Sequence, residues 1–155
     1  MNLSSRRFSI IIPGFIVIFV FYAGCKEKDD NGNVWKNCYE CNTESWIGTF
    51  SGTGNYTSIA FPAYAENKPV SIIIEETAPD YLIVYFSCPN YISATISGSL
   101  VSNYVISFAS SGSSITATMD IKDQDLKLTG TVKKFHMQAD STILDELINF
   151  ETYKQ

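Results

Sequence analysis

From residue 46 to the C-terminus, apolar and polar residues alternate with a period of two, and serine and threonine fill most of the polar positions. This period is typical of strands with one buried face, whereas an amphipathic helix repeats about every 3.6 residues. The pattern predicts eight strands, at residues 46–56, 70–76, 81–86, 91–100, 104–109, 114–121, 126–137 and 147–153.

The first predicted strand places Trp46, Phe50 and Tyr56 on one face, together with three glycines. Glycines on one face of a strand indicate sharp coiling, as where a sheet bends to close. Residues 55–69 are predicted to form a long connection whose aromatic segment lies across the mouth of a barrel. Residues 140–146 are predicted to contain one helical turn.

Eight strands joined mostly by short turns predict an all-β fold, an antiparallel meander that closes into a barrel and so removes its exposed edges. A two-sheet β-sandwich is the structural alternative. The predicted barrel domain spans residues 45–155, which is a typical length for one domain with its own core.

The N-terminal segment lacks this alternation and is instead a basic end followed by a continuous apolar run. Arg6 and Arg7 precede an apolar run at residues 10–22, and two small residues then lead to Cys25. A basic end, a short apolar stretch and a small-residue exit are typical of a secretory signal. Because a membrane-spanning helix needs about 20 apolar residues, this run is too short to span. The segment before Cys25 resembles a bacterial lipobox, with Tyr22 where an aliphatic residue is usual, which implies cleavage after residue 24 and acylation of Cys25.

Residues 25–44 are predicted to form a flexible tether that begins with the acylated cysteine and includes a CxxC pair. The lysines and acids directly after Cys25 cannot form a core. They resemble the export signal of surface lipoproteins of Bacteroidota, which implies a lipid anchor in the outer membrane and exposure at the cell surface.

The net charge of the predicted mature chain excludes some classes of binding partner. Loss of Arg6 and Arg7 with residues 1–24 leaves 9 of the 11 basic residues against 16 acidic ones, a formal net charge of 9 − 16 = −7. An acidic domain lacks the basic footprint of a nucleic-acid-binding protein and has no attraction to anionic headgroups. Contact with the membrane is therefore expected only through the acyl chains.

Three further cysteines, Cys38, Cys41 and Cys88, would lie in an oxidising compartment. Cys38 and Cys41 could close a small ring, or one of them could pair with Cys88. A redox site, or a zinc site completed by His136, requires a spacing or a βαβ context that the chain does not show.

The sequence offers little catalytic chemistry. His136 is the single histidine, so it is the only candidate base for a nucleophilic triad, and it lies at the end of a predicted strand. Glu75 and Glu76 point to opposite faces, and the acids at 120–125 lack the pattern of an EF-hand. We therefore predict no enzyme activity, no metal and no cofactor. Asp140-Ser141-Thr142 resembles the O-glycosylation signal of Bacteroidota, which would place a glycan on Ser141.

The lipobox, the charged tether and the early Trp-x-Gly-x-Phe-x-Gly strand together resemble the lipocalin-like, or calycin-like, lipoproteins of Bacteroidota. The resemblance implies a barrel that binds a small apolar or glycan-derived ligand. Five aromatic residues are candidates to line the pocket or an interface: Trp46, Phe50, Tyr64, Tyr85 and Tyr104. The alternative is a filled barrel that acts as an accessory or adhesive subunit and binds a protein or polysaccharide through its exterior.

Overall fold

The computed structural model describes residues 34–155, which form one antiparallel sheet of nine strands and a single short helix. The elements are β1 (Lys36–Asn37), α1 (Thr43–Trp46), β2 (Gly48–Ser58), β3 (Ala63–Ala78), β4 (Tyr81–Cys88), β5 (Ile92–Ser99), β6 (Val105–Ser110), β7 (Ser113–Lys122), β8 (Asp125–Gln138) and β9 (Ser141–Lys154).

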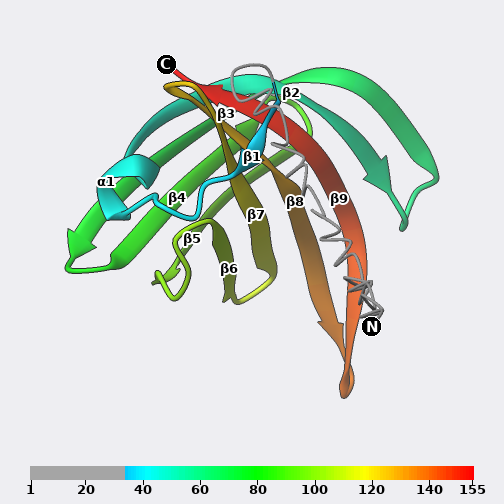
Figure 1. Ribbon diagram of the computed structural model, residues 1–155. Coiled ribbons are helices and arrows are strands. Elements are labelled where there is room, and N and C mark those ends of the chain that lie inside the picture. The colour runs from blue at the N-terminus through cyan, green and yellow to red at the C-terminus, as the bar shows by residue number, and fades with distance from the viewer. Residues whose placement is uncertain (1–33) are drawn as a thin grey trace, which may run out of the picture.

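The sheet is curled but not closed (Figure 1). Its order is β1-β7-β8-β9-β2-β3-β4-β5, and β6 pairs with β7 on the same edge as β1. Closure would require a ladder between β5 and β6, and no such ladder is present among the described strands. The two strands are nevertheless neighbours, because a Cβ at Gly98 on β5 would overlap the ring of Phe108 on β6. The Phe108 side chain thus packs between β5 and β6, where a closed barrel would have backbone hydrogen bonds.

Strands β2 to β9 confirm the prediction of an all-β antiparallel fold. Two predicted segments differ. The long connection at 55–69 is instead a continuation of β2 and β3 into a hairpin with its turn at 59–62. The helical turn expected within 140–146 is strand, because β9 pairs with β8 up to Gln138 and Ser141. Both segments are polar enough to read as loops, but pairing with a neighbouring strand satisfies their backbone groups.

One end of the curled sheet, here named the closed end, is covered by residues 38–47. Trp46 is fully buried at the end of α1, and its indole Nε1–H donates to the carbonyl oxygen of Asn103 at 3.0 Å. The Lys154 ammonium donates to the carbonyl of Ser45 at 2.9 Å, which holds the C-terminal strand against α1. Within the predicted tether, β1 pairs with β7 and the backbone N–H of Cys38 donates to the carbonyl of Met119 at 2.9 Å, so the end of the tether belongs to the folded domain.

The concave side of the sheet is filled with side chains. Phe86 on β4 and Phe150 on β9 are separated by two strands in the sheet, yet their ring centroids lie 5.5 Å apart. Alternate residues of β7 and β8, including Ile115, Met119 and Leu128, are buried as the period of two predicts. The curl therefore encloses a packed core.

Candidate ligand-binding site

The end opposite the closed end, here named the open end, carries the turns between β2 and β3, β4 and β5, β6 and β7, and β8 and β9. Two consecutive rows of residues cross the concave face there. The inner row is apolar and buried, and comprises Phe108, Ile115, Val132, Ile148 and Tyr56. The next row outward, here named the polar row, comprises Ser110, Ser113, Lys134, Glu146 and Ser58. The concave face thus changes from apolar to polar within one step of the ladder.

The polar row forms much of one wall of a hollow of about 760 Å³, here named the rim groove. Its lining comes from three hairpins: Ser58, Ala60 and Phe61 of β2–β3; Ser111, Gly112 and Ser113 of β6–β7; and Lys134, Phe135, His136, Asp145 and Glu146 of β8–β9. Figure 1 shows that the β2–β3 and β8–β9 hairpins project beyond the rest of the sheet. A groove of this size accommodates a small ligand.

A bulge in β9 brings two consecutive acids to the groove. Lys134 pairs with Glu146, whereas Phe135 pairs with Leu144, so Asp145 is the extra residue. Its carboxylate lies 2.6 Å from Nδ1 of His136. Without the bulge, Asp145 and Glu146 would point to opposite faces of the sheet, since strand side chains alternate.

Glu146 has a hydrogen-bond partner deeper in the sheet. The hydroxyl of Tyr56 donates to its carboxylate at 2.7 Å. Burial, and then this hydrogen bond to a carboxylate, raise the pKa of Tyr56 above its ordinary value. The pair fixes Glu146 at the boundary between the apolar core and the polar row.

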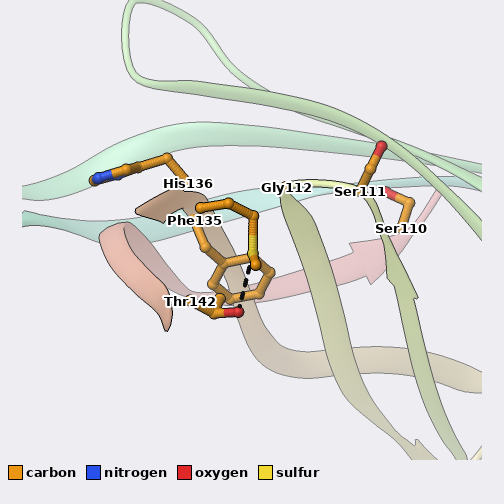
Figure 2. A pocket seen from close by; sticks show the side chains of 7 residues that line it. Ser110, Ser111, Gly112, Phe135, His136 and Thr142 are labelled. Carbon is orange, nitrogen blue, oxygen red and sulfur yellow. Dashed lines mark hydrogen bonds between the residues drawn. The ribbon is translucent and has the colours of Figure 1, made fainter. Parts of the chain in front are cut away.

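A second hollow, of about 450 Å³, adjoins the rim groove and shares Ser111, Gly112, Phe135 and His136 with it. Figure 2 shows Phe135 and Thr142 side by side, while the His136 ring points away from them. The backbone N–H of Phe135 donates to the carbonyl of Gly112 at 2.9 Å, so the β6–β7 turn and β8 are held together between the hollows.

None of the five aromatic residues that the sequence suggested lines either hollow. Trp46 and Phe50 are fully buried in the core. Tyr104 packs edge-on against Tyr39, with ring centroids 4.7 Å apart, near the closed end. Tyr85 is partly exposed on the convex face beside Ile73, and Tyr64 is exposed on β3.

The aromatic residues that do line the rim groove are Phe61 and Phe135. Phe61 lay in the segment predicted to cross the barrel mouth, which was a usable signal. Phe135 had none, because it lines the groove beside Gly112 of the β6–β7 turn, a segment distant from it in the sequence.

The structure pairs Cys38 with Cys41, and leaves Cys88 as a buried thiol at the end of β4. Burial raises the pKa of the Cys88 thiol, while the charge of Lys68 acts in the opposite direction. No group of three His, Cys, Asp or Glu side chains in residues 34–155 is arranged to hold a metal ion.

Two predicted modification sites remain. Ser141 is exposed at the start of β9, next to the β8–β9 turn, where a glycan would have room. Cys25 lies outside the described residues, as do the rest of the predicted signal and the start of the tether.

Comparison with known proteins returned no match: no family model, no curated protein and no solved structure is similar to this chain. Within the part of the chain that the structure describes, no helix has the length and apolar character needed to cross a membrane.

Proposed function

We propose that the chain is a non-enzymatic lipoprotein, anchored to the outer membrane through acyl chains on Cys25 and exposed at the cell surface, that binds a small apolar or glycan-derived ligand. The observation that carries the binding role is the rim groove of about 760 Å³, which three hairpins surround at the open end. The lipid anchor rests on the sequence around Cys25 and its resemblance to a lipobox.

The direction in which the chain enters the domain supports this arrangement. Trp35 packs against Tyr153 with ring centroids 5.7 Å apart, and the Lys127 ammonium lies 4.9 Å from the centre of its indole. These contacts lie near the closed end. The segment from Cys25 to Val34 can reach at most about 30 Å when fully extended. The closed end then faces the membrane and the rim groove faces away from it.

We further propose that the domain is a calycin-like barrel whose seam lies between β5 and β6. Phe108 over Gly98 supports this assignment, because it brings β5 and β6 into contact although they share no ladder. Residues 38–47 cover one end of the sheet, and the other end is where the rim groove lies.

The alternative role, an accessory or adhesive subunit that binds a protein or polysaccharide through its exterior, is favoured by a different observation. The concave side is packed with side chains, and Ile73, Tyr85 and Tyr81 are exposed on the convex face. Aromatic rings exposed on a sheet face are suited to contact with a partner.

The anchor is tested by expressing the full chain and a Cys25→Ser variant in a bacterium that processes lipoproteins. We expect the parent chain in the membrane fraction, with its new N-terminal cysteine carrying acyl chains by mass spectrometry, and the variant released. Equal membrane association of both chains, without acylation, would refute the anchor.

The binding role is tested by native mass spectrometry of the full chain extracted from cells in mild detergent. We expect a bound small molecule that is lost in Phe61→Ala, which removes a groove side chain that is 81% exposed. Tyr85→Ala on the convex face is the matched control. Loss of the bound species in Tyr85→Ala alone would favour the exterior-binding alternative.

A further inference from the structure

The side chains of the rim groove discriminate between the two ligand classes of the proposed function, on which this inference rests. We infer that the groove takes a neutral, hydroxyl-rich ligand, such as the sugar rings of a short glycan, and not an apolar chain. The polar row continues across β6, β7, β8, β9 and β2.

An apolar ligand would have to cover charged groups without replacing their water. Lys134, Asp145 and Glu146 all line the rim groove. Removing water from a charge is costly unless a hydrogen-bonding partner takes its place, and a hydrocarbon supplies none. The apolar core that could hold a hydrocarbon is already filled, because Val132 and Ile148 close the floor directly beneath the polar row.

A hydroxyl-rich ligand meets these groups with complementary chemistry. A hydroxyl both donates and accepts, so it can accept from the Lys134 ammonium, donate to the carboxylates of Asp145 and Glu146, and do either with Ser58 or Ser113. Hydrogen bonds to charged groups are shorter and stronger than neutral ones. The same wall therefore stabilises a sugar and disfavours a fatty acyl chain.

The charges also argue for a ligand without net charge. Lys134 stands opposite Glu146 in the ladder, and Asp145 lies against His136. An anionic ligand would meet two carboxylates, and a cationic ligand would meet Lys134. The groove thus presents one ammonium and two carboxylates, one of which lies against His136, so an anion and a cation would each meet a group of like charge.

Two aromatic rings at the rim groove are also suited to binding a sugar. Phe61 projects from the β2–β3 turn, and Phe135 lies at the base of the β6–β7 turn. An aromatic face packs against the C–H face of a sugar ring while the ring's equatorial hydroxyls remain free for the polar row. Apolar area combined with a few placed polar groups is the usual composition of a small-molecule site.

The test compares the full chain, in detergent, against two kinds of probe: a glycan array that holds neutral and charged oligosaccharides, and two apolar chains, palmitate and uncharged hexadecanol. We expect binding to neutral glycans and none to palmitate or hexadecanol. We expect Phe61→Ala and Lys134→Met each to weaken the strongest glycan at least tenfold, while Tyr85→Ala on the convex face leaves its affinity within twofold. Thermal unfolding of each variant shows whether it is folded.

The outcomes separate the inference from the proposed function. Palmitate or hexadecanol binding that Phe61→Ala abolishes, without glycan binding, would overturn the inference and leave the proposed function standing. Selective binding of anionic glycans, or glycan binding that only Tyr85→Ala weakens, would also overturn it. Failure of both kinds of probe, together with the absence of a ligand in native mass spectrometry, would refute the two together.

Discussion

The fully buried Trp46 at the closed end carries the most decisive prediction about stability. It ends α1, has an exposed fraction of 0%, and donates its indole N–H to the carbonyl of Asn103. Truncation of a buried aromatic side chain to alanine costs about 3–5 kcal/mol, from lost burial and the cavity left behind. Since a whole domain has about 5–15 kcal/mol of stability, Trp46→Ala removes a large share of it.

The same replacement at Trp35 is the matched control. Its indole lies on the convex face over Lys127, partly exposed, where a cation–π contact contributes about 0.5–1 kcal/mol. We expect Trp35→Ala to lower the free energy of unfolding by about 1 kcal/mol. Trp46→Phe, which keeps a ring but loses the N–H, should fall between the two variants, at about 1–2 kcal/mol.

The assay is urea unfolding at 25 °C followed by circular dichroism, because replacing either tryptophan alters fluorescence. About 1 kcal/mol corresponds to a shift of about 3–6 °C in Tm for a domain of this size. Trp46→Ala should therefore melt about 9–30 °C below the parent chain in a thermal scan. If it costs no more than Trp35→Ala, the closed end is not sealed by Trp46 and this account of the fold is wrong.

Three further predictions concern Cys88, Gly130 and Tyr56. In a Cys25→Ser background, Cys88 should react with a thiol reagent at pH 8 only after urea is added, because burial raises the pKa of its thiol and keeps the reagent away from it. Rapid reaction of the folded chain would contradict this. Gly130→Ala would push a Cβ into the backbone of β7, so urea unfolding should show a free energy of unfolding lower by about 1–3 kcal/mol or more. Thr129→Ala, at the half-exposed neighbouring position, should lower it by less than about 1 kcal/mol. The raised pKa of Tyr56 contributes stability that is present below about pH 10 and is lost as the pH rises through the folded-state pKa. The free energy of unfolding of the parent chain should therefore exceed that of Tyr56→Phe by less at about pH 11 than at about pH 8. An unchanged difference would contradict the statement that burial raises this pKa.

The period of two determined most of the fold, because it is a local property of the chain. Each strand needs only its own alternation to specify a buried and an exposed face, so the inward positions Ile106, Ile115 and Leu128 were predictable. The turns were equally local, since Asn, Asp and Gly mark places where the backbone takes a positive φ, as it does at Asp80, Asn90 and Asp123.

Features that depend on two distant segments were decided only by the tertiary structure. Residues 141–146 become strand because β8 offers them a partner, and Asp145 reaches the rim groove because it is the extra residue of a bulge in the β8–β9 ladder. Trp46 was expected on the first strand, but its indole finds its partner 57 residues away. The polar row is scattered along the sequence at five places, and only strand register aligns it. Alternation within a strand predicts which of its faces is buried. It does not predict the register between strands, which decides which residues of neighbouring strands lie side by side and so form a site.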